Sequence, residues 1–142
     1  MEKKITGSGA KAYQREDTEW RAKPYSDWHR KLDKSLLMTD VDFIEWRFIN
    51  GELKAVGIME VTRVDMGINV TEGYLENIIH RFEERDFQAK AARKVAKSLD
   101  TSAYIILFRE DCSEFWTYDL NRKHGWKHHD PQQFEEALKK LR

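Results

Sequence analysis

An Asn50-Gly51 pair between two apolar segments is the strongest constraint on how this chain folds. Residues 38–48 before it and 53–61 after it are rich in β-branched and aromatic side chains, which favour strands. Asn-Gly readily adopts the positive backbone φ angles that tight hairpin turns need. The sequence therefore predicts a β-hairpin centred on this pair.

The segments outside the hairpin predict helices and a second pair of strands. Ser26 caps a short predicted helix after Pro24, with apolar residues at 25, 28 and 32. Residues 72–99 carry two apolar stripes that are out of phase, which indicates two helices, or one helix whose halves face different partners. Residues 103–108 and 114–120 predict strands.

A terminal helix is predicted to begin at Asp130-Pro131, a capping residue followed by a favourable first helical residue. The expected order is thus helix, strand, strand, helix, strand, strand, helix. Such an order packs as a mixed β-sheet flanked by helices, an α/β or α+β fold.

Length and composition predict one domain. The 142 residues suit a single core, which we place at 24–142, preceded by a tail or short polar helix at 1–23. The 25 basic residues balance the 25 acidic ones, so the net charge does not point to nucleic acid, a membrane or an acidic partner. Cys112 is the only cysteine and no apolar run resembles a signal peptide or a membrane span, so we expect a cytoplasmic protein without a membrane partner.

Three acids, Asp40, Asp42 and Glu60, lie within the apolar hairpin segments, where a carboxylate needs a partner. A two-residue turn would place Asp42 opposite Met59 and turn Glu60 to the other face. A three-residue turn would instead place Asp40 or Asp42 opposite Glu60. A shared site for Mg²⁺ or Mn²⁺, which prefer carboxylate oxygens, therefore predicts the odd-length turn.

These acids give residues 26–108 a resemblance to the PD-(D/E)XK nuclease superfamily, whose hairpin presents an Asp and then a (D/E)-x-K tripeptide. Asp42 matches the first acid, with Asp40 as an alternative, and Glu60 matches the acid of the tripeptide. Gln88 resembles the polar helix residue of some branches. The resemblance implies a restriction-endonuclease-like fold and metal ligands at Asp42, Glu60 and Asp40.

Thr62 stands where that superfamily has lysine, and its hydroxyl cannot supply a positive charge. Lys90 is the first candidate for the replacement cation, and Lys94 and Arg63 are the others. His29, before the hairpin, is a candidate base or metal ligand. The catalytic candidates are therefore Asp42, Glu60, Thr62, Gln88, Lys90 and His29.

The function implied by the resemblance is metal-dependent hydrolysis of phosphodiester bonds in DNA, less so in RNA. We also expect that the protein can form a homodimer. Two other functions remain open: a nuclease fold that has lost catalysis and binds nucleic acid or assembles complexes, and a small protein-interaction domain unrelated to nucleases. The acids could equally lie on an exposed edge beside basic neighbours. Gln88 and Lys90 could belong to a solvated helix face.

Overall fold

The computed structural model describes residues 18–85 and 87–142. The chain divides into two units, with the boundary between Met38 and Thr39.

The first unit contains helix α1 (Thr18–Arg30). The helix predicted after Pro24 is present, but it begins at Thr18 and includes the proline. Asp27 forms ion pairs with Lys23 (2.9 Å) and Arg30 (3.1 Å), which support the turns on either side of it. Of the predicted tail at 1–23, residues 1–17 lie outside the described part of the chain.

The second unit is built on a five-stranded mixed sheet with the strand order β1-β2-β3-β4-β5. The strands β1 (Phe43–Ile49) and β2 (Glu52–Val64) form the predicted antiparallel hairpin. Strand β3 (Ala103–Arg109) runs parallel to β2, and β4 (Phe115–Asp119) returns antiparallel to β3. A short strand, β5 (Lys127–His129), completes the edge. The expected α/β class is confirmed.

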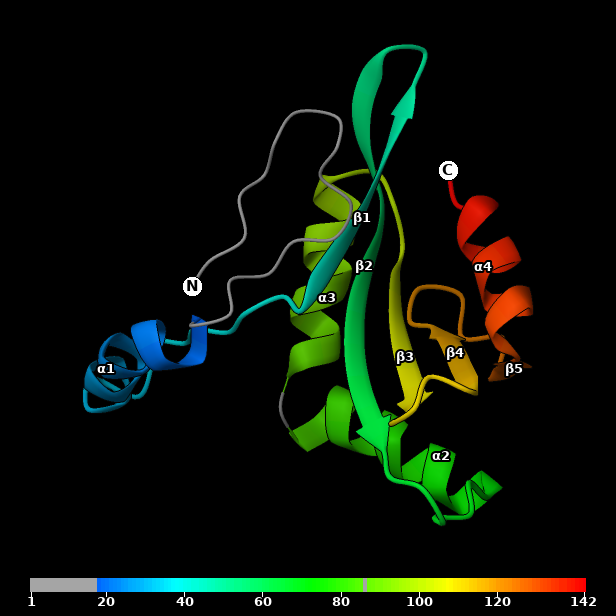
Figure 1. Ribbon diagram of the computed structural model, residues 1–142. Helices are drawn as coiled ribbons and strands as arrows, with labels where there is room; N and C mark the ends of the chain where they lie inside the picture. Colours follow the sequence, from blue (N-terminus) through cyan, green and yellow to red (C-terminus); the bar gives the residue numbers. More distant parts are fainter. Residues whose placement is uncertain (1–17, 86) are drawn as a thin grey trace. The chain divides into compact units, whose positions relative to one another are not determined.

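Helical segments connect β2 to the parallel strand β3, as a parallel pair requires. They are α2 (Glu72–His80), a π-helical turn η2 (Arg81–Arg85) and α3 (Gln88–Ser98), so the out-of-phase stripes belong to two helices. The terminal helix α4 (Pro131–Lys139) begins with the predicted cap, because the Asp130 carboxylate accepts from the Gln133 N–H. Figure 1 shows α3 and α4 on opposite sides of the sheet.

The main core lies between the sheet and the helices α2 to α3. Side chains alternate along β2, so those of Ile58 and Val64 point into this core, whereas Met59 lies on the side of Leu141, beyond α4. Helix α3 contributes only small buried side chains, which let its backbone approach the sheet: Ala89, Ala92 and Ala96. Residue 60 is two positions after Ile58 along the strand, so the Glu60 side chain lies on the same face of the sheet as Ile58, the face that α3 covers.

The predicted odd-length turn is wrong. Ile49 pairs with Glu52 around the two-residue loop Asn50-Gly51, with φ angles of 52° and 79°. Positive φ at both loop residues matches the right-handed twist of a hairpin, which is why this turn is preferred. Taken alone, such a turn would separate Asp42 from Glu60.

A β-bulge in the hairpin reverses that consequence. Glu45 pairs with Gly57 but Trp46 pairs with Ala55, so Val56 is an extra residue without a partner in β1. The pairing beyond the bulge is shifted by one residue, and Phe43 lies opposite Met59. Asp42, the next residue outward, therefore comes opposite Glu60 on the face of α3.

Candidate active site

The carboxylates of Asp42 and Glu60 are held together through each other's strand backbone. The Asp42 main-chain N–H donates to Glu60 Oε2 at 3.2 Å. In return, the Val61 N–H donates to Asp42 Oδ2 at 2.9 Å. These two bonds continue the β1–β2 pairing with side-chain acceptors and fix both carboxyl groups at the start of β1. No basic side chain among residues 18–85 and 87–142 pairs with either carboxyl group.

Glu60 is the buried member of this pair, with 2% of its surface exposed. Burial, followed by the side-chain hydrogen bond and the negative charge of Asp42, raises the pKa of Glu60 from 4.5 to about 8. Asp40 is exposed and adds a smaller repulsion. An isolated Glu60 therefore keeps its proton at neutral pH, and a nearby cation would favour the charged form.

Thr62 follows Glu60 on the same face and contacts a cation that the sequence did not single out. Arg81 Nη2 donates to Thr62 Oγ1 at 3.0 Å, and the Arg81 guanidinium also lies 5.0 Å from the centre of the Phe82 ring. Arg81 is the first residue of the π-helical turn η2, a type of distortion often found at functional sites. No local pattern links positions 62 and 81, because the fold of the crossover connection brings them together.

The cations considered from sequence lie elsewhere. Arg63 points to the other face of β2 and pairs with Asp65 at 3.2 Å. Lys90 and Lys94 line an open cavity on α3. Among the described residues, neither lysine has a hydrogen bond or ion pair with Asp42, Glu60 or Thr62.

Gln88 and His29 are the other two candidates. Gln88 is half-buried at the start of α3, and in the described part of the chain it forms no hydrogen bond with either acid. His29 belongs to α1, in the first unit. The second unit thus brings together Asp42, Glu60, Thr62 and Arg81.

The donor set of this site fits a hard divalent cation. Within residues 18–85 and 87–142, no three His, Cys, Asp or Glu side chains gather closely enough to hold a metal ion. Mg²⁺, however, is commonly bound through one or two carboxylates together with water and substrate phosphate oxygens. Asp42 and Glu60 supply two adjacent carboxyl groups, and Glu60, whose pKa is raised to about 8, would have to lose its proton to act as a ligand.

Comparison with known proteins adds no relative: no family model, curated protein or solved structure matches the chain. In the part of the chain that the structure describes, none of the helices has the length and apolar character needed to cross a membrane.

Proposed function

We infer that this protein is a metal-dependent nuclease of the PD-(D/E)XK type that hydrolyses phosphodiester bonds in DNA. The observation that carries this proposal is the pairing of Asp42 with the buried Glu60 through reciprocal backbone bonds. Two facing carboxyl groups inside an apolar hairpin are costly for structure alone, because both lose solvation and the negative charge of Asp42 opposes ionisation of Glu60.

Asp42 and Glu60 would hold Mg²⁺ or Mn²⁺. Such an ion, when bound, polarises the phosphodiester and lowers the pKa of an attacking water. Glu60 must release its proton to act as a ligand. The bulge at Val56 positions both groups on one face.

Arg81 would supply the positive charge that lysine provides in the superfamily. Its guanidinium is bound to Thr62, two residues after Glu60 on the same strand face. A guanidinium remains protonated at any working pH and offers planar donors that match phosphate oxygens. It can therefore stabilise the negative charge that develops on the phosphate in the transition state.

A cleavage assay tests this function. The protein is incubated with supercoiled, linear and branched DNA in Mg²⁺ or Mn²⁺, beside Asp42→Asn and Glu60→Gln variants. We expect cleavage by the wild type that both substitutions abolish. Cleavage that survives both substitutions, or no cleavage of any substrate, would overturn the proposal.

A nuclease fold without catalysis, kept for binding nucleic acid or for assembly, is the second candidate. Thr62 at the lysine position favours it, since the hydroxyl cannot itself carry charge. This alternative predicts DNA binding that does not depend on Mg²⁺, and no cleavage.

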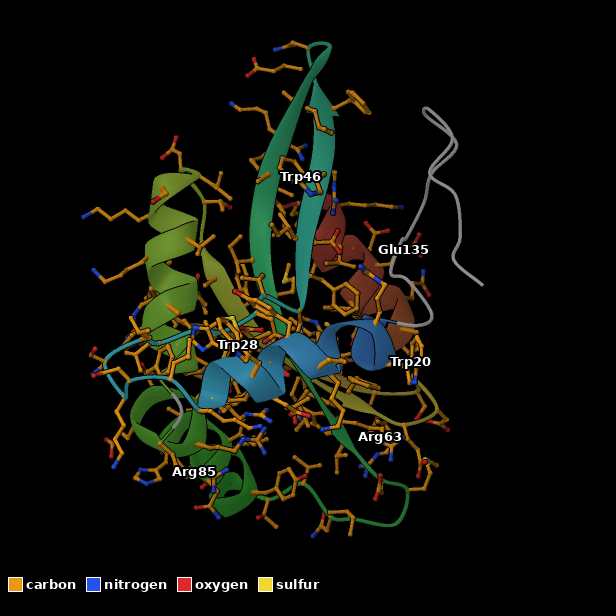
Figure 2. All side chains as sticks on the ribbon, turned by 90° about the vertical axis from the view of Figure 1, so that its left-hand side faces the viewer. Trp20, Trp28, Trp46, Arg63, Arg85 and Glu135 are labelled. Carbon is orange, nitrogen blue, oxygen red and sulfur yellow. The ribbon has the colours of Figure 1, made fainter. Side chains whose placement is uncertain are left out.

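An exposed apolar patch favours the third candidate, a protein-interaction role. The patch lies on one face of the hairpin and consists of Trp46 (45% exposed), Phe48 (70%) and Leu53 (52%). Figure 2 shows Trp46 on the hairpin, whose tip extends beyond β3 in Figure 1. Exposed aromatic side chains of this kind are enriched at protein interfaces.

A further inference from the structure

Helix α3 carries a row of cations that the carboxylate pair does not use. The row, which we call the α3 row, consists of Lys90, Arg93, Lys94 and Lys97. At 100° per residue these positions fall within an arc of about 100° on the helix. The buried residues Ala89, Ala92 and Ala96 lie on a different side, so the row can face outward while the alanines pack on the sheet.

The charge of this row is not compensated by acidic residues within helix α3. The whole chain has equal numbers of basic and acidic residues, yet the segment 88–98 has four basic residues and no acidic one. Like charges at i,i+3 and i,i+4 destabilise a helix, and a helix that is merely solvated usually alternates the signs of its charges. The row therefore costs stability that a ligand of opposite charge would recover.

Among the four cations of the α3 row, only Arg93 has an ion-pair partner in the described part of the chain. Arg93 is half-buried and pairs with Glu83 at 2.7 Å, which Lys123 also approaches at 3.4 Å. Within residues 18–85 and 87–142, no carboxylate forms an ion pair with Lys90, Lys94 or Lys97. These three lysines are exposed and remain available to an anion.

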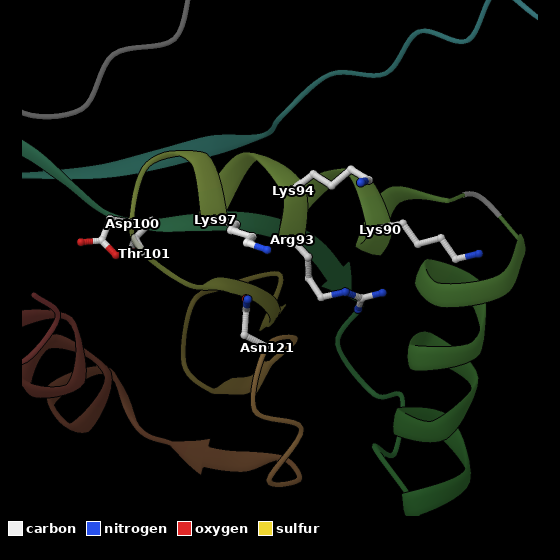
Figure 3. Close-up of a pocket in the computed structure, with 7 residues that line it drawn as sticks. All are labelled: Lys90, Arg93, Lys94, Lys97, Asp100, Thr101 and Asn121. Atoms are coloured by element: carbon white, nitrogen blue, oxygen red, sulfur yellow. The ribbon is translucent and has the colours of Figure 1, made fainter.

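The surroundings of the row add hydrogen-bond donors. The row lines an open cavity of about 530 Å³, together with Asp100, Thr101 and Asn121. Asn121 Oδ1 accepts from the Ala103 N–H at 2.8 Å, which leaves the side-chain NH₂ as the amide group that can donate to a ligand. Figure 3 shows the four cations projecting from α3 and Asn121 coming from the loop after β4. Asp100, near the end of the row, is the one acid in the lining.

We propose that the α3 row holds the sugar-phosphate backbone of duplex DNA, the substrate of the proposed nuclease function on which this inference rests. From Lys90 to Lys97 the helix rises about 10 Å, and one DNA strand presents a phosphate about every 3.4 Å of the duplex axis. Three lysines along that length suit about three phosphates. Helix α3 packs on the sheet face that carries Glu60 and Thr62, so the row and the carboxylates lie on the same side of the sheet.

The test measures DNA binding under conditions without metal ions, where cleavage does not occur. Affinity for a labelled 20-base-pair duplex is followed by fluorescence anisotropy in EDTA, over a series of salt concentrations. The variant replaces Lys90, Lys94 and Lys97 by Gln. The control removes three exposed lysines elsewhere in the second unit, by Lys54→Gln, Lys139→Gln and Lys140→Gln.

We expect the α3 variant to bind at least about tenfold more weakly at low salt. The slope of log K against log salt should fall in magnitude by about 3, because three phosphate contacts are lost. The control variant should bind within about twofold of the wild type. A triple Lys→Arg variant at the α3 positions should retain DNA binding, which excludes misfolding as the cause of the loss. Inorganic phosphate at matched ionic strength should not compete with the duplex for the protein if a row of phosphates is recognised.

The binding and cleavage results distinguish failure of the α3 row from failure of the proposed nuclease function. Weak binding by the wild type, or an α3 variant that binds as the wild type does, would overturn the role of the row, even if Asp42 and Glu60 still support cleavage. Loss of binding in the α3 variant without any cleavage by the wild type would support the row and reject the nuclease.

Discussion

The guanidinium of Arg81 donates a hydrogen bond to the hydroxyl of Thr62 at 3.0 Å. This contact joins the strand that carries Glu60 to the π-helical turn η2. In the proposed nuclease, it places a permanent cation next to Thr62, the residue aligned with the lysine of the PD-(D/E)XK pattern.

Arg81→Gln should lower the rate of DNA cleavage by about 100-fold, the usual effect of removing one group that stabilises transition-state charge. Thr62→Lys added to this variant should restore part of the rate, because the new ammonium group would lie two residues after Glu60. Single-turnover cleavage is the measurement. Arg63→Gln, on the other face of β2, is the control, and an Arg81→Gln variant as fast as this control would contradict the role of Arg81.

The raised pKa of Glu60 makes stability depend on pH. Between pH 4.5 and about 8, the unfolded chain has an ionised Glu60 while the folded chain keeps the proton. The folded state therefore binds more protons, and this contribution to stability is full below pH 4.5 and is lost as pH rises through about 8. Urea unfolding in EDTA should show a downward slope of at most about 1.4 kcal/mol per pH unit from this group.

Glu60→Gln isolates this effect from other titrating groups. His129, whose pKa is lowered mainly by burial, contributes with the opposite sign in both proteins. The difference in unfolding free energy between wild type and Glu60→Gln should therefore change between pH 5 and 8. A constant difference would show that Glu60 titrates normally in the folded state.

Mn²⁺ should stabilise the wild type more at pH 8 than at pH 5, because a metal ion binds the ionised carboxylate and competes with the proton. The measurement is the thermal midpoint with and without Mn²⁺ at each pH. Asp42→Asn should remove most of the shift. An equal shift in that variant would place the ion elsewhere.

The hairpin turn depends on Gly51, whose φ is +79°. Gly51→Ala should lower the free energy of unfolding by about 1 kcal/mol, since an alanine Cβ is strained in this conformation although nothing lies within 4 Å of it. Gly73→Ala in α2 is the control and should be neutral or stabilising, because Gly73 lies in a helix, where alanine is preferred. Equal effects would argue against the two-residue turn.

The close approach of α3 to the sheet depends on its buried alanines. Ala92 is 1% exposed, so Ala92→Leu should destabilise the protein by about 1–3 kcal/mol through overpacking. Urea unfolding measures the loss. An unchanged midpoint would mean that the helix can move away from the sheet without cost.

Much of this fold could be predicted from local sequence. Asn50-Gly51 marks the hairpin, the two out-of-phase stripes mark two helices, and Asp130 marks the start of α4, all as the structure has them. These features depend on residues close in sequence, whose backbone preferences and capping bonds act over a few positions. Helix α1 is the exception, since ion pairs of Asp27 accompany a helix that continues through Pro24.

The sequence by itself determined which side chains could serve chemistry, namely the acids Asp42 and Glu60 inside an apolar hairpin. Only the tertiary structure decided that they meet. The two-residue turn alone would place Asp42 opposite Met59, and the bulge at Val56 shifts the pairing by one residue so that Asp42 lies opposite Glu60. The tertiary structure also decided which cation contacts Thr62, by bringing Arg81 of the crossover connection within hydrogen-bond distance of it. Both outcomes depend on contacts between distant segments, where a shift of one residue along a strand exchanges the two faces of the sheet.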